Sequence, residues 1–270
     1  MVLLPLTNWG LMTLLFGVLT RQRAPHVRFG EMGALIGSAW LLNIIPGRPG
    51  VVGRVAYHSA VNNVPVKESV RVIVVGLVSN AVALALALLL VGAGWLAAQM
   101  LPRELAVEAT AKFLILGAAA TLSLLISFAW LQRGKASRPD APVEPWRFGF
   151  AVAVRYADYL IWVARYWLAF DVIGTPISLS EAAGIAVVSQ VVQLSPAQLG
   201  IREWAVGVAG TALPSLRSLS SLGKSPATGL TADLLCRAAE LAMQLPVGLV
   251  CTWWVMRQVR KATSEPPARA

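Results

Sequence analysis

Apolar segments long enough to cross a lipid bilayer recur along the whole chain. A helix needs about 20 predominantly apolar residues to span the hydrocarbon core. Charged residues make up only 13% of this sequence, against about 25% in soluble domains, and the short alternating segments of membrane β-barrels do not occur in it. We therefore predict an all-α polytopic membrane protein with about five full transmembrane helices. The segments expected to span are 1–20, 66–98, 104–131, 148–170 and 227–256.

Two further apolar stretches, 29–62 and 179–213, are each interrupted by proline and glycine, the first at Pro46 and the second at Pro196. Each half of such a stretch is too short to cross the membrane by itself, so we expect each stretch to form a re-entrant hairpin of two half-length helices. Backbone groups freed by a break at membrane depth are tolerated only where protein or a water-filled cavity receives them. Both breaks are therefore expected in the interior of the protein.

The positions of the basic residues support this path. If both hairpins return to the face from which they enter, eleven Lys and Arg residues lie on one face and only three, Arg103, Arg217 and Lys224, on the other. Cytoplasmic loops of membrane proteins carry this kind of excess, so we expect the C-terminus to be cytoplasmic. The net charge of +10 does not indicate nucleic-acid binding, because the basic residues lie at the ends of the predicted helices.

A polar, proline-containing linker divides the chain into two membrane halves. The first half, 1–131, contains a helix, the hairpin 29–62 and two spans. The linker occupies 132–147, the second half occupies 148–256, and a basic cytoplasmic tail follows at 257–270.

The two halves show weak internal symmetry. Pro46 and Pro196 each have a glycine four residues later and an arginine soon after, and the predicted path makes the two hairpins enter from opposite faces. We therefore predict an inverted-topology repeat. In transporters, such repeats place discontinuous helices around a site near the bilayer midplane.

The breaks carry charged residues that are expensive in a membrane and usually functional. The helix that begins after Gly200 directs free N–H groups and its positive dipole end toward the break. With Arg202 in its first turn, this end is suited to a phosphate or a carboxylate, and Arg48 and Arg54 offer the same chemistry at the first break. The alternative is that Arg202 and Glu203 pair with neighbouring spans and only stabilise the fold.

Two predicted spans also carry polar stripes at helical spacing. Polar faces turn inward in lipid, where they either pair across helices or line a path, and both interpretations are open. The stripes consist of Arg155, Asp158, Trp162 and Arg165 on one span, and of Asp233, Arg237, Glu240 and Gln244 on the last.

Signals for a metal, a cofactor or a catalytic nucleophile are absent from the sequence. His26 and His58 have no carboxylate at ligand spacing, and there is no phosphate-binding loop and no nucleophile elbow. Cys236 and Cys251 are about 22 Å apart along one helix, too far for a disulfide. We expect no metal and no cofactor. The alternative to a transporter is an integral-membrane acyl or glycosyl transferase that uses Asp158 or Glu203 as its base.

The motifs at the two breaks resemble those of the transmembrane flippase domain of the lysylphosphatidylglycerol synthase family and its stand-alone bacterial relatives. The resemblance covers about residues 41–254 and rests on the residues 43–50 with Arg54, on the residues 196–203, and on Arg237. Val51, Leu77 and Asn80 depart from the pattern that is common in this family.

This resemblance implies a multi-pass protein of the bacterial cytoplasmic (inner) membrane that moves an anionic or modified lipid between leaflets. It also allows a role in a lipid-linked glycan pathway, as an accessory subunit or with a glycosyltransferase partner. Taken together, the breaks, the stripes and the resemblance predict these substrate-binding residues: Pro46, Gly47, Arg48, Gly50, Arg54, Arg155, Asp158, Arg165, Pro196, Gln198, Gly200, Arg202, Glu203, Arg237 and Glu240.

Overall fold

The computed structural model describes residues 1–45, 47, 49–100, 144–192, 201–212 and 225–264, and these parts are helical with short connections and no strand. This confirms the all-α fold class. The helices are α1 (Leu3–Thr20), α2 (Phe29–Leu42), α3 (Pro49–Val61), α4 (Val66–Met100), α6 (Pro145–Val172), α7 (Leu179–Val192), α8 (Ile201–Ala212) and α10 (Ser225–Ser264).

Among the described helices, three are long and apolar enough to cross a membrane, judged by length and composition, which is compatible with the predicted membrane protein. They are α1, the part of α4 from Val66 to Ala93, and the part of α10 from Ala227 to Ser264. The predicted span 148–170 forms α6, which has sufficient length but carries charged residues along its middle. The predicted span 104–131 lies outside the described residues.

Two boundaries differ from the predicted ones. Helix α10 continues to Ser264, so the first part of the predicted tail 257–270 is helical. Helix α6 begins at Pro145, inside the predicted linker 132–147. Proline is favoured in the first turn of a helix because its missing N–H has no intrahelical partner there, and this places the start of α6 earlier than the apolar pattern indicated.

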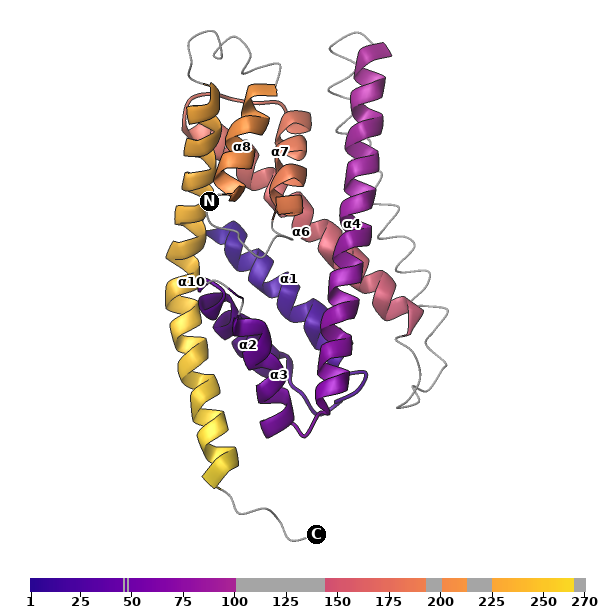
Figure 1. Cartoon of the computed structure of the whole chain (residues 1–270), viewed down its shortest axis with the longest axis vertical. Helices are drawn as coiled ribbons and strands as arrows, with labels where there is room; N and C mark the ends of the chain where they lie inside the picture. Colours follow the sequence, from indigo (N-terminus) through magenta and orange to yellow (C-terminus); the bar gives the residue numbers. More distant parts are fainter. Residues whose placement is uncertain (46, 48, 101–143, 193–200, 213–224, 265–270) are drawn as a thin grey trace.

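The long helices α4 and α10 run along the long axis on opposite sides of the molecule, and α1 and α6 cross obliquely between them (Figure 1). The pair α2–α3 lies toward one end of this axis and the pair α7–α8 toward the other (Figure 1). Helix α10 is long enough to contact both pairs, with extensive packing against α2 and α8. The two interrupted stretches of the sequence are thus two helical hairpins at opposite ends of one bundle.

The first hairpin enters and leaves at the same end. Before α2, Arg23 Nε lies 3.2 Å from Glu68 Oε2 at the start of α4. At the same end, the amide of Asn62 donates a 2.7 Å hydrogen bond to Glu31 Oε1 in the first turn of α2. At the opposite end of the hairpin, the Asn43 side chain accepts a hydrogen bond from the backbone N–H of Gly50 at 3.1 Å, which joins the end of α2 to the start of α3.

Glycine allows close helix packing at three places in this region. A Cβ at Gly50 would overlap the backbone of Ala39, so α3 approaches α2 more closely than any side chain permits. A Cβ at Gly37 would come within 2.6 Å of Cys251 Sγ, and one at Gly248 within 2.6 Å of Leu41 Cβ. Small residues at contacts between helices are typical of membrane proteins, where close van der Waals packing drives association. Gly37 and Gly248 thus bring the first hairpin close to α10, and Gly50 brings its two helices together.

The second hairpin is set by a capping box and by packing on α6. Ser178 and Glu181 exchange hydrogen bonds: the Ser178 N–H donates to Glu181 Oε2 at 2.9 Å, and the Glu181 N–H donates to Ser178 Oγ at 3.3 Å. This arrangement satisfies free N–H groups at the start of α7. Tyr159 of α6 then donates a 3.0 Å hydrogen bond to the carbonyl of Ala183, which holds α7 against α6.

Candidate functional site

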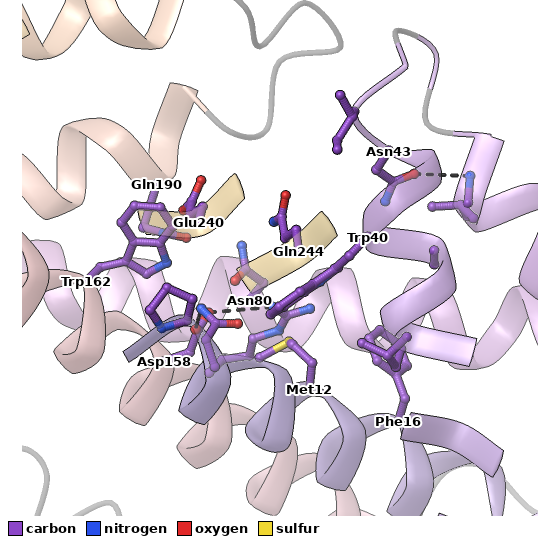
Figure 2. A pocket seen from close by; sticks show the side chains of 18 of the residues that line it. Met12, Phe16, Trp40, Asn43, Asn80, Asp158, Trp162, Gln190, Glu240 and Gln244 are labelled. Atoms are coloured by element: carbon purple, nitrogen blue, oxygen red, sulfur yellow. Dashed lines mark hydrogen bonds and ion pairs between the residues drawn. The ribbon is translucent and has the colours of Figure 1, made fainter. Parts of the chain in front are cut away.

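A cavity of about 380 Å³ lies between the two hairpins, and all eight described helices contribute residues to its lining. Asn43, Gly50 and Arg54 line it from the first hairpin, and Gln190 and Arg202 line it from the second. Figure 2 shows polar side chains from several helices directed into this space. The volume falls within the usual range for small-molecule sites. The cavity is therefore the candidate functional site.

One wall of the cavity is formed by two arginines that flank a single aromatic ring. The guanidinium carbon of Arg54 lies 3.9 Å from the centroid of Phe16, and that of Arg155 lies 6.0 Å from the same centroid. Arg54 is only 9% exposed, and within the described parts of the chain no carboxylate forms an ion pair with it. Arg155 lies 3.8 Å from Asp158, and its Nε has no hydrogen-bond partner among the described residues.

From the second hairpin, Arg202 joins the start of α8 to α10. Its Nε and Nη2 both donate to Asp233 Oδ1, at 3.0 and 2.8 Å. Tyr166 of α6 donates to the same oxygen at 2.6 Å. Arg202 is 2% exposed and Asp233 is fully buried, so this is a desolvated ion pair with a supporting hydroxyl.

Glu240 of α10 forms ion pairs with three arginines. Its carboxylate lies 2.7 Å from Arg165 Nη1, 3.6 Å from Arg202 Nη1 and 3.3 Å from Arg237 Nη1. Arg165 also donates to the carbonyl of Cys236 at 2.9 Å. The ring of Trp162 stacks against two of these cations, with its centroid 4.1 Å from the Arg165 guanidinium carbon and 4.7 Å from that of Arg202. Cation–π contacts of this kind are strongest when desolvated.

The charges around the cavity do not balance. Five arginines line it against two carboxylates, with Asp233 as a third acid behind the wall, so the described residues leave an excess of two positive charges. Unpaired charge is costly in a low-dielectric interior. The cavity therefore favours an anion. The residues counted are Arg54, Arg155, Arg165, Arg202 and Arg237, with Asp158 and Glu240.

The structure brings together eight of the predicted substrate-binding residues and separates two others from them. Gly47 adopts a positive φ of 91° and does not line the cavity, and Glu203 is half-buried outside it. Pro46, Arg48, Pro196, Gln198 and Gly200 lie outside the described residues. The residues brought together are Gly50, Arg54, Arg155, Asp158, Arg165, Arg202, Arg237 and Glu240.

The polar stripes both pair and line the cavity. The pairs Arg155–Asp158 and Arg237–Glu240 form within their own helices, while Asp158 also accepts a hydrogen bond from Asn8 of α1. The sequence left open whether these stripes pair across helices or line a path; Asp158, Arg165 and Glu240 do both, while Asp233 pairs with Arg202 and does not line the cavity.

Several residues that line the cavity were not predicted from the sequence. Asn8, Asn80 and Gln190 each bring an amide into the cavity, and Phe16 and Trp40 bring aromatic faces. The signal that marks the amides is a single uncharged polar side chain within an otherwise apolar helix, because such a group needs a partner in a membrane protein. Phe16 and Trp40 have no comparable signal, since aromatic residues are equally common on lipid-facing surfaces.

Among the described residues, no group of three or more His, Cys, Asp or Glu side chains is placed to hold a metal ion. Cys236 and Cys251 are both free and buried. Comparison of the chain with protein-family models, with curated proteins and with solved structures found no match. The chemistry of the cavity is therefore the basis for assigning a function.

Proposed function

We propose that this chain is a flippase-like protein that moves an anionic or modified lipid headgroup between membrane leaflets. The observation that carries the proposal is the cavity with excess positive charge between two hairpins. The headgroup enters the cavity, where arginine side chains replace its hydration, while the acyl chains remain in the hydrocarbon. The membrane concerned is the bacterial cytoplasmic membrane that the family resemblance implies.

Exposed apolar residues at the edge of the cavity support a lipid rather than a soluble anion. Ile44, which follows the end of α2, and Leu77 on α4 both line the cavity, and they are 38% and 50% exposed. A site for a water-soluble anion gains nothing from apolar side chains at its entrance. For a lipid, these side chains offer a surface to the first part of the acyl chains while the phosphate contacts the arginines.

The phosphate is best received by Arg54 and Arg155. Hydrogen bonds between guanidinium groups and phosphate oxygens are charge-assisted and often bidentate. Arg54 has no described carboxylate partner and Arg155 has an unused Nε, so both retain donors for a ligand. Arg202 directs its Nε and Nη2 to Asp233, and Arg165 pairs with Glu240 through Nη1 while its Nε has no partner among the described residues. We assign the phosphate to the Phe16 side of the cavity.

The two hairpins are proposed to be re-entrant and related as an inverted repeat. Their placement at opposite ends of the bundle and their shared cavity support this arrangement (Figure 1). Transporters with inverted repeats rock one repeat against the other around a fixed central site. In this chain the α7–α8 hairpin holds Arg202 and the α2–α3 hairpin holds Arg54, so such a motion would change the distance between the two arginine groups.

The transferase alternative needs a carboxylate that is free to act as a base. Asp158 is occupied by Asn8 and Arg155, Glu240 by three arginines, and Glu203 does not line the cavity. This arrangement favours translocation over group transfer.

Translocation is tested directly with fluorescent lipids in proteoliposomes. We expect liposomes that contain the protein to move labelled phosphatidylglycerol from the inner to the outer leaflet faster than protein-free liposomes. The measurement is the fraction of label that a membrane-impermeant quencher reaches over time. Equal rates with and without protein, for phosphatidylglycerol and for other anionic phospholipids, would refute the proposal.

The re-entrant path is tested by labelling single cysteines in a cysteine-free background. Arg28 lies just before the first hairpin and Lys67 just after it, and both are exposed. Arg28→Cys and Lys67→Cys should therefore react with an impermeant reagent from the same side. Asp171, exposed before the second hairpin, should react from the opposite side as Asp171→Cys. Labelling of positions 28 and 67 from opposite sides would mean that the first hairpin crosses the membrane.

A further inference from the structure

Uncharged amide side chains line the cavity together with the arginines. Asn80 comes from α4, Gln190 from α7 and Gln244 from α10. Figure 2 shows Asn80 and Gln244 directed into the same part of the cavity as the ring of Trp40. Gln190 is 8% exposed, and its Nε2 has no hydrogen-bond partner in the described parts of the chain. A buried donor of this kind normally has a partner.

Amides of this kind match hydroxyl groups chemically. An Asn or Gln side chain offers two donors and one accepting oxygen, and a hydroxyl both donates and accepts. A polyol can therefore satisfy several amides at once, whereas a bare phosphate offers only acceptors. The flat face of Trp40 beside Asn80 and Gln244 adds a surface for the C–H groups of the same polyol.

A cationic headgroup has no partner in this cavity. The two lining carboxylates are already engaged, Asp158 by Asn8 and Arg155 and Glu240 by three arginines. An added ammonium group would face the excess positive charge of the arginines without a free carboxylate to compensate it. Within a cavity of about 380 Å³ the ammonium group would lie close to the arginines, and repulsion between like charges grows as the distance between them falls.

We propose that the preferred headgroup is a phosphate that carries an uncharged polyol, such as glycerol, inositol or a sugar, and not an aminoacylated or otherwise cationic group. This rests on the proposed function in that it assumes the cavity is the lipid site. The phosphate lies against Arg54 and Arg155, and the hydroxyl groups hydrogen-bond to Asn80, Gln190 and Gln244. The amides thus determine specificity and the arginines provide the charge attraction.

Equilibrium binding of short-chain lipids to the purified full chain in detergent tests this assignment separately from movement. The probes are dihexanoyl forms of phosphatidylglycerol, phosphatidic acid and aminoacylated phosphatidylglycerol, titrated by calorimetry. Charge attraction alone favours phosphatidic acid, which carries the larger negative charge. We expect the opposite order, with phosphatidylglycerol bound about two- to tenfold more tightly, since each net hydrogen bond contributes a factor of this size. The aminoacylated lipid should bind most weakly.

Two substitutions identify the residues responsible. Asn80→Leu and Gln244→Met keep approximately the size of each side chain and remove its hydrogen-bonding groups. Each should reduce the ratio of phosphatidylglycerol affinity to phosphatidic acid affinity toward one. Gln258→Met is the matched control, because Gln258 lies on the same helix as Gln244 but outside the cavity, and it should leave the ratio unchanged.

The outcomes separate the headgroup assignment from the proposed function. Tighter binding of phosphatidic acid than of phosphatidylglycerol by the unmodified protein would overturn the assignment, as would tightest binding of the aminoacylated lipid or a ratio that survives both cavity substitutions. If the expected binding order holds but proteoliposomes move no lipid, the assignment stands and translocation fails. If lipid moves without the expected binding order, translocation stands and the assignment fails.

Discussion

Replacing Asp233 with leucine is expected to lower the free energy of unfolding by about 3–5 kcal/mol, the usual cost of removing one partner of a buried ion pair. Asp233 is fully buried and accepts hydrogen bonds from Arg202 and from the Tyr166 hydroxyl. Without it, Arg202 remains buried with only Glu240, 3.6 Å away, as a compensating charge. Denaturant unfolding in mixed micelles measures the loss.

The double variant Arg202→Met with Asp233→Leu distinguishes a structural role from a functional one. Well-packed apolar replacements of both partners of a buried ion pair are often neutral for stability, so the double variant should recover most of the stability that Asp233→Leu loses. If Arg202 also attracts the headgroup, the double variant should move lipid more slowly than the unmodified protein even though its stability is restored. Full stability in Asp233→Leu alone would show that this ion pair does not hold α8 to α10.

Replacing Arg54 with glutamine is expected to slow movement of an anionic lipid roughly ten- to a hundredfold, because a hydrogen bond to a charged group contributes about 1.5–3 kcal/mol. Arg54 is buried beside Phe16 with its guanidinium group at the cavity. No carboxylate among the described residues is left unpaired by this change, so the fold should tolerate it. The rate of lipid movement in proteoliposomes checks the prediction.

Two further variants define what the loss at Arg54 means. Arg54→Lys keeps the charge without the bidentate geometry, and we expect it to retain part of the activity. Arg257→Gln removes an arginine from the exposed end of α10, which lies outside the cavity, and should have no effect on the rate. An unchanged rate in Arg54→Gln would show that Arg54 does not bind the phosphate. It would also overturn the assignment of the phosphate to the Phe16 side of the cavity.

The positions of the helices and their breaks could be predicted from the sequence because both depend on local chemistry. Apolar length placed α1, α4 and α10, and proline with glycine predicted the break near Pro46, which the structure places between the end of α2 at Leu42 and the start of α3 at Pro49. Helical spacing also grouped Arg155, Asp158 and Arg165 on one face of α6, and that face lines the cavity.

The partners of these charges could not be predicted in the same way. Spacing alone pairs Arg237 with Glu240 one turn away, and this pair forms. It does not show that Glu240 also receives Arg165 and Arg202 from two other helices. Nor does it show that Asp158 meets Asn8, a residue 150 positions earlier. These contacts depend on how helices pack, and the approach of α3 to α2 through Gly50 is a matter of a few ångströms.

The sequence by itself determined that the chain is helical, with apolar helices long enough to cross a membrane and two interrupted helical hairpins, because apolar length and helix breaking act within one segment at a time. Only the tertiary structure decided that the hairpins share one cavity, which arginines are neutralised there and which are not. Helix packing decides this, because a neighbouring helix brings a carboxylate to Arg202, whereas Arg54 meets the ring of Phe16 instead.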